Sequence, residues 1–212
     1  MSRKKTGCKN CMTARQITKN GVITFEAPEK IEDLEEVKYT YNYAEASNYA
    51  DNKQNIYKKK KTSVDLDLTF SSIVLKTRAQ LQGKDYAKGG AATGTDDQSL
   101  PVAVLFQETY DDGSYENVVF YNVKLYEKDG DQKSEGENIE FTSQGFTGRG
   151  LYFTNDKITN KFEYRMDSAD PEVDKEKLNN FFKAVQYYEA AEETNKQTTL
   201  EKEEIEDNTS AE

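Results

Sequence analysis

The fold is decided by a run of alternating residues, Val37-Lys38-Tyr39-Thr40-Tyr41-Asn42-Tyr43. Aromatic and β-branched residues occupy every second position, and mostly polar residues lie between them. This period of two is typical of a β-strand with one buried face. A second run, Ser63-Val64-Asp65-Leu66-Asp67-Leu68-Thr69-Phe70, repeats the pattern. The two runs predict two strands that place their apolar faces against a common core.

Further strands are predicted downstream. Pro101–Tyr110 is an apolar run whose proline stands at the first position, where a strand tolerates it. The turn signal Asp112-Gly113 separates this run from residues 117–127, so the two should form a hairpin. A second turn signal, Asp129-Gly130, precedes an expected strand over residues 137–146. Two shorter candidates cover residues 151–153 and 162–164.

Two helices are expected within this pattern. The first covers residues 71–82 and ends at Gly83, a residue suited to the left-handed position after a helix. The second covers residues 168–190, with Asp170 as the N-cap and Pro171 as the first helical residue. Its apolar positions follow helical spacing and should pack on the chain's own sheet: Leu178, Phe181, Phe182, Val185 and Tyr188. The predicted class is therefore mainly β (α+β), with one short internal helix and one C-terminal helix.

The charge is unevenly distributed along the 212 residues. The whole chain has 29 basic and 39 acidic groups, a net charge of −10. Residues 1–169 are nearly neutral, with 24 basic against 26 acidic groups, whereas residues 189–212 hold two lysines and nine carboxylates. We therefore expect a β domain over 1–167 with long loops at 44–61 and 84–100. The C-terminal helix would follow, and then an acidic, disordered tail over 191–212.

Several functions are disfavoured by composition. The chain has no histidine, which removes Ser-His-Asp and Cys-His catalysis and histidine metal sites. Cys8 and Cys11 form a CxxC motif, but no further Cys or His completes a zinc site, so two reduced structural thiols are expected. The sequence contains no run of about 18 apolar residues, so no membrane-spanning helix is predicted. We expect no enzyme activity, no cofactor and no metal.

Two charged motifs have a plain and a functional interpretation. Four successive lysines, Lys58–Lys61, would suit nucleic acid, yet they lack interleaved aromatics or arginines, which favours a solvated edge. Asp65 and Asp67 lie two residues apart, so both project from one strand face. Paired carboxylates can act as acid and base, but no nucleophile or metal partner accompanies them, and a polar strand surface is preferred over catalysis.

The order of these motifs resembles a known family. Gly7-Cys8-Lys9-Asn10-Cys11-Met12-Thr13-Ala14-Arg15-Gln16-Ile17 is similar to the N-terminal segment of the major tail proteins of long-tailed phages of Gram-positive bacteria. Tyr49-Ala50-Asp51-Asn52-Lys53 resembles the signature of that family's long loop. The strand ending at Phe70, the helix ending Leu81-Gln82-Gly83, and the segments Leu100–Phe106 and Tyr121–Tyr126 follow the family's order. The resemblance covers residues 7–155; the two cysteines and the acidic C-terminal extension depart from it.

The resemblance implies a tail tube subunit with a β-sandwich or barrel fold. Such subunits form hexameric rings that stack into a hollow tube, through which the phage genome passes without specific binding. The implied partners are further copies of the chain, other tail proteins and assembly chaperones, with no membrane binding. The protein would be made in the bacterial cytoplasm and act in the virion.

The same resemblance implies roles for particular residues. The loop 44–61 would bridge successive rings through candidate contacts at Tyr49, Asp51, Asn52, Lys53 and Tyr57. Asp65 and Asp67 would face the lumen, where carboxylates repel DNA phosphates.

Two other functions remain open at this point. The alternative to a structural protein is a binding protein, namely a β-sandwich module on a virion or cell surface that recognises carbohydrate or a protein receptor. A hydrolase that uses carboxylates is the least supported, because no reaction centre can be assembled from these residues.

Overall fold

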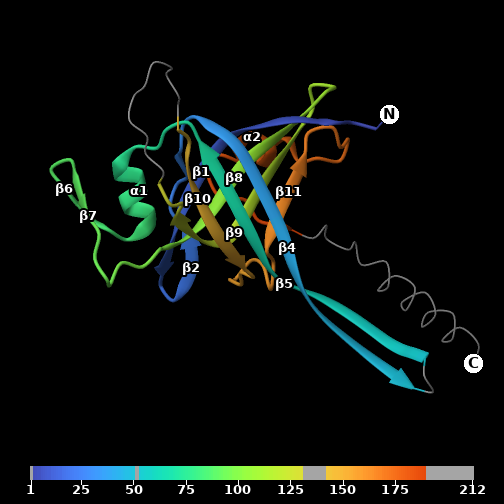
Figure 1. The fold of residues 1–212 in the computed structure, drawn as a ribbon. Helices are drawn as coiled ribbons and strands as arrows, with labels where there is room; N and C mark the ends of the chain where they lie inside the picture. The colour runs from blue at the N-terminus through green and yellow to red at the C-terminus, as the bar shows by residue number, and fades with distance from the viewer. Residues whose placement is uncertain (1, 51–52, 131–141, 190–212) are drawn as a thin grey trace, which may run out of the picture.

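The computed structural model describes residues 2–50, 53–130 and 142–189 (Figure 1). It has 55% of its residues in strands and 8% in helices, which confirms the mainly β prediction. The elements in chain order are β1 (Lys5–Lys19), β2 (Val22–Phe25), β3 (Glu29–Lys30), β4 (Leu34–Ala50), β5 (Lys53–Phe70), α1 (Leu75–Gln82), β6 (Asp85–Ala87), β7 (Gly90–Ala92), β8 (Pro101–Tyr110), β9 (Tyr115–Glu127), β10 (Gln144–Leu151), β11 (Glu163–Asp167) and α2 (Lys175–Asn180).

Nine of the strands form one antiparallel sheet. Its main path runs β2-β1-β8-β9-β10-β5-β4, while β11 pairs with β9 and β3 with β1. The predicted hairpin at Asp112-Gly113 is confirmed as the β8–β9 connection, in which Gly113 has a φ of 82°. A one-sheet arrangement leaves β4 at the end of the main path.

The sheet curls so that β4 approaches β1 (Figure 1). Lys5 Nζ lies 3.4 Å from the Tyr39 hydroxyl, and the Cys8 thiol lies 4.0 Å from the Glu35 carbonyl oxygen. The curl encloses a core that includes the four apolar residues predicted on β5, namely Val64, Leu66, Leu68 and Phe70. The alternation in the sequence therefore identified the buried face of this strand correctly.

A second core lies on the other face of β1, β8 and β9. Tyr121 is fully buried there and stacks on Tyr187 with ring centroids 5.8 Å apart. Leu178, Phe181 and Val185 pack in the same core. The C-terminal segment thus covers its own sheet, as the sequence predicted.

The predicted helix over residues 168–190 is wrong in extent. Asp170 closes a turn by accepting from the amide of Glu172, and α2 begins only after Asp174, whose side chain caps the amide of Lys177 at 3.0 Å. The helix ends at Asn180. Residues 181–183 form a turn and the chain is irregular afterwards, yet Phe181 and Val185 are buried in the second core and Tyr187 packs against it.

The internal helix is shorter than expected but ends where predicted. α1 covers Leu75–Gln82, and Gly83 caps it at a φ of 70°. A Cβ at Gly83 would lie 2.3 Å from the carbonyl oxygen of Gln98, so the site needs glycine for space as well as for conformation.

The two predicted loops are partly wrong. Residues 44–50 and 53–61 are not a loop, because they continue β4 and β5 as a paired hairpin. The loop 84–100 contains the small hairpin β6–β7, turned by Lys88 and Gly89 at positive φ, and is irregular afterwards. Of the strand expected over 137–146, β10 begins at Gln144, and residues 137–141 lie outside the described residues. The acidic tail 191–212 also lies outside them.

Candidate assembly surface

A two-stranded arm projects from the sheet. It consists of residues 43–50 of β4 and 53–62 of β5. Figure 1 shows it leaving the body where β4 ends and β5 begins. Ala44 pairs with Lys60 and Ala46 with Lys58, so the ladder continues beyond the core. At about 3.3 Å per residue, the arm extends about 20–25 Å. A hairpin that leaves its own core is suited to contacting something else.

On one face of the arm, the charged side chains pair with each other across the two strands. Lys59 Nζ lies 4.5 Å from the centre of the Tyr43 ring and 2.7 Å from a carboxylate oxygen of Glu45. Hydrogen bonds from Lys59 and then Tyr57 lower the pKa of Glu45, which stays charged at neutral pH. These cross-strand contacts hold the two strands in register.

The opposite face of the arm is different and is called the lysine face below. It carries Ala44 and Ala46 opposite Lys60 and Lys58, all exposed. Within the described ranges, no carboxylate forms an ion pair with either of these two lysines. The lysine face therefore combines two small side chains with two lysines, and neither lysine has an ion-pair partner among the described residues.

The base of the arm is anchored to β11. Lys61 Nζ lies 3.4 Å from the centre of the Tyr41 ring and 4.0 Å from a carboxylate oxygen of Glu163. The Tyr41 hydroxyl donates a hydrogen bond to Glu163. Burial, and then this bond to a carboxylate, raises the pKa of Tyr41 well above its ordinary value. The arm is thereby fixed where it leaves the sheet.

A larger charge network continues from this anchor. The Arg165 guanidinium lies 3.2 Å from Glu163, 3.2 Å from Glu108 and 3.5 Å from Glu116, and 5.0 Å from the centre of the Tyr39 ring. Burial acts to lower the pKa of Arg165, but the neighbouring carboxylates outweigh it and raise that pKa.

Glu108 is the most buried member of this network. Its side chain is 8% exposed and accepts from Lys5, Arg165 and the Tyr39 hydroxyl, the last at 3.1 Å. The side chains of this network come from β1, β4, β8, β9 and β11. They lie where β4 approaches β1 without pairing with it by backbone hydrogen bonds in the described residues. Sequence reasoning missed the network, although a glutamate inside the apolar run 101–110 was a signal of a buried partner.

The candidate lumen residues both carry a cation partner. Asp65 accepts from Arg149 Nε at 2.7 Å and from the Asn42 amide at 2.7 Å, and these bonds lower its pKa. Asp67 pairs with Lys128. The two carboxylates lie on β5, half-exposed, on the face opposite the core. Their place on a lumen stays a prediction, and their charges are locally compensated.

The candidate inter-ring residues fall at the end of the arm. Tyr49 pairs in register with Gln54, and Ala50 with Lys53. Tyr57 is 54% exposed. Asp51 and Asn52 lie outside the described residues. The predicted segment is thus brought to the far end of a projecting hairpin.

The cysteines are free thiols on β1. Cys11 is fully buried, and its burial, followed by the nearby Cys8, raises its pKa to about 12. A bulge between Lys9 and Met12, with Asn10 at a φ of 58°, interrupts the ladder between them.

In the described part of the chain, no group of three or more Cys, Asp or Glu side chains is placed to hold a metal ion. Within the same ranges, no helix is long and apolar enough to cross a membrane.

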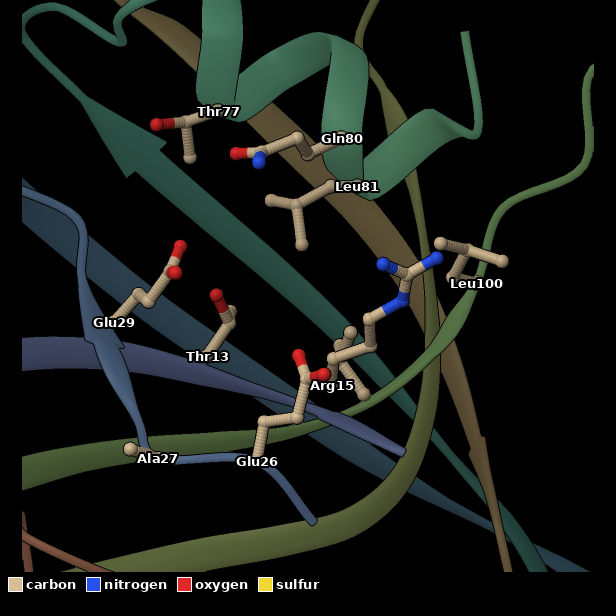
Figure 2. A pocket seen from close by; sticks show the side chains of 10 residues that line it. Thr13, Arg15, Glu26, Ala27, Glu29, Thr77, Gln80, Leu81 and Leu100 are labelled. Carbon is tan, nitrogen blue, oxygen red and sulfur yellow. The ribbon is translucent and has the colours of Figure 1, made fainter. Parts of the chain in front are cut away.

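A small cavity lies between α1 and the N-terminal strands (Figure 2). Arg15 and Thr13 of β1 and Glu29 of β3 line one side, and Gln80 and Leu81 of α1 line the other. The lining residues include no histidine, cysteine or serine that a carboxylate could activate. The cavity offers polar contacts, including the hydroxyls of Thr13 and Thr77 and the carboxylates of Glu26 and Glu29.

No protein-family model and no curated protein matches this sequence. The functional argument therefore rests on the residues and their geometry.

Proposed function

We propose that this chain is a structural subunit that assembles with copies of itself into stacked rings, as the tail tube subunit of a phage or related particle. The observation that carries the proposal is the arm, a paired hairpin that extends beyond the core with one face left unsatisfied. The side chains described for its outer part, at 44–47 and 57–60, are exposed and belong to neither core of the subunit. Its conformation is explained if a neighbouring copy completes its contacts.

The exposed sheet edge supports the same function. β4 ends the main path of the sheet, and among the described residues its outer backbone groups form no ladder, although β1 approaches its first half. Such edges promote pairing with other chains unless they are covered. Ring formation would cover the edge, since each subunit would supply the partner for the next.

The resemblance of residues 7–155 to major tail proteins adds the kind of assembly. We propose hexameric rings, contacts with other tail proteins and chaperones during assembly, and passage of genomic DNA through the lumen without specific binding. The protein would act in the virion after synthesis in the bacterial cytoplasm. No catalytic step, cofactor or metal is assigned.

Removal of the arm tests this proposal. Residues 44–60 are replaced by Asn-Gly, which connects Tyr43 to its ladder partner Lys61 through a two-residue hairpin turn and keeps the register. The wild-type protein should form hollow rings and tubes in negative-stain micrographs. The shortened variant should keep its melting temperature, because the side chains described in the deleted stretch, at 44–47 and 57–60, are exposed, but it should not stack.

Two results would count against the proposal. Tubes of normal length from the shortened variant would remove the role of the arm. A wild-type protein that stays monomeric at every concentration and salt would overturn the assembly function and favour the binding module.

A further inference from the structure

The two ends of β4 carry opposite charge. The strand begins at Leu34 in the turn Glu32-Asp33-Leu34-Glu35-Glu36, called the acidic turn below, and ends in the arm. From Leu34 to Ala46, which pairs with Lys58, the strand rises over 12 residues at about 3.3 Å each, so the acidic turn and the lysine face lie about 40 Å apart along it. Figure 1 shows the start of β4 at one end of the sheet and the arm leaving the other. A single strand thus fixes the distance between the two surfaces.

The arm is positive overall. Residues 43–62 contain five lysines and two acidic residues, a net charge of +3. Lys59 and Lys61 are engaged within the subunit, by Glu45 and by Glu163. The excess charge that is free to act on another molecule is therefore concentrated on the lysine face, at Lys58 and Lys60.

The acidic turn has the complementary charge. Residues 29–38 contain five acidic residues and two lysines, a net charge of −3. Lys30 pairs with Glu32 and Lys38 with Glu36. Glu35 accepts from Ser143 and Ser71, and these hydrogen bonds lower its pKa, so it stays charged; among the described residues no cation pairs with it. Asp33 is exposed as well.

We propose that the lysine face of one copy lies on the acidic turn of the next copy, so that the stacking contact is electrostatic and head-to-tail. This inference rests on the proposed function and names the surface that receives the arm. The small side chains of Ala44 and Ala46 allow close approach of the arm, while Lys58 and Lys60 meet Asp33 and Glu35. A second copy is the occupant because one chain carries both surfaces with equal and opposite charge.

Charge reversal and its rescue test the contact. Lys58→Glu with Lys60→Glu places carboxylates against the acidic turn and should raise the protein concentration needed for stacking by at least about tenfold. Adding Asp33→Lys and Glu35→Lys to the same chain reverses the two carboxylates of the contact and should restore stacking. The matched control Lys19→Glu with Lys76→Glu makes the same charge change on exposed body positions and should stack like the wild type.

Salt gives a second measurement that needs no variant. Sedimentation velocity of the wild type should show stacks at 50 mM salt that separate at 500 mM, because screening weakens exposed ion pairs. Stacking that is indifferent to salt, or a Lys58→Glu, Lys60→Glu protein that stacks as well as the wild type, would overturn this contact and leave the assembly function standing. A wild type that never assembles would instead overturn the proposed function itself.

Discussion

The substitution Arg165→Met tests the charge network in which this arginine lies. The side chain is 26% exposed and contacts Glu108, Glu116 and Glu163 within 3.5 Å. Methionine keeps much of the packing of the aliphatic stem but removes the charge and all of its hydrogen bonds. The three carboxylates would then lose their shared cation.

The expected loss in the free energy of unfolding depends on the partners that the carboxylates keep after the substitution. Glu108 keeps Lys5, and Glu163 keeps the Tyr41 hydroxyl, with Lys61 at 4.0 Å. Removal of one partner of a fully buried ion pair costs about 3–5 kcal/mol, and the partial exposure of Arg165 places this case at about 3 kcal/mol. For a domain of this size, that corresponds to a fall in melting temperature of about 6–12 °C.

Thermal unfolding followed by circular dichroism measures this effect, since the chain has no tryptophan to report it by fluorescence. Arg149→Met is the matched control, because Arg149 is 64% exposed and pairs with the half-exposed Asp65. Its melting temperature should change little. If Arg165→Met lowers the melting temperature no more than Arg149→Met does, the network does not hold the open side of the sheet together.

The remaining predictions concern the thiols and the tyrosines. Cys8 is partly exposed and Cys11 fully buried, so a thiol reagent at pH 8 should modify Cys8 first and Cys11 only as urea unfolds the chain; immediate reaction of both would contradict the buried site. Burial raises the pKa of Tyr110 to about 12 and also raises the pKa values of Tyr41 and Tyr121. Above pH 10 the unfolded chain therefore loses protons that the folded chain keeps, and the free energy of unfolding should fall towards pH 12 by up to about 1.4 kcal/mol per pH unit for each such group. Urea titrations at successive pH values measure it, and a free energy that stays constant from pH 10 to 12 would refute it.

The strands that bury one face could be predicted from the sequence. Val64, Leu66, Leu68 and Phe70 alternate because only one side of β5 meets the core. The run Pro101–Tyr110 is buried on both faces and was recognised by its apolar length instead of by alternation. Local conformation at Gly83 and Gly113 was equally visible, since both turns need positive φ.

The arm could not be predicted by the same signal. Both of its faces lie outside the core, so residues 44–61 show no alternation of apolar and polar positions. Its strands are held by ladder hydrogen bonds continued from the body and by contacts such as Glu45 with Lys59. Hydrophobic periodicity reports burial, and a paired hairpin without burial therefore looks like a loop.

The C-terminal segment shows the opposite failure. Leu178, Phe181 and Val185 have helical spacing, and all three are buried, yet α2 ends at Asn180. The pattern reported correctly which residues meet the sheet but not the backbone that brings them there. Glu108 in its apolar run indicates that a buried partner exists, but the sequence does not identify that partner, because Arg165 lies 57 positions further along the chain.

The distribution of charge, more than its total, explains how such a subunit would assemble. Asp65 and Asp67 are each matched by a cation on the same sheet face, so this face has little excess charge of its own. Along β4 and its hairpin partner, the charges without an ion pair among the described residues lie towards the two ends, positive at Lys58 and Lys60 and negative at Asp33 and Glu35. Two surfaces about 40 Å apart on one strand cannot satisfy each other within one subunit. A head-to-tail contact between them leaves one surface of each kind free at every step, so it extends a stack without closing it.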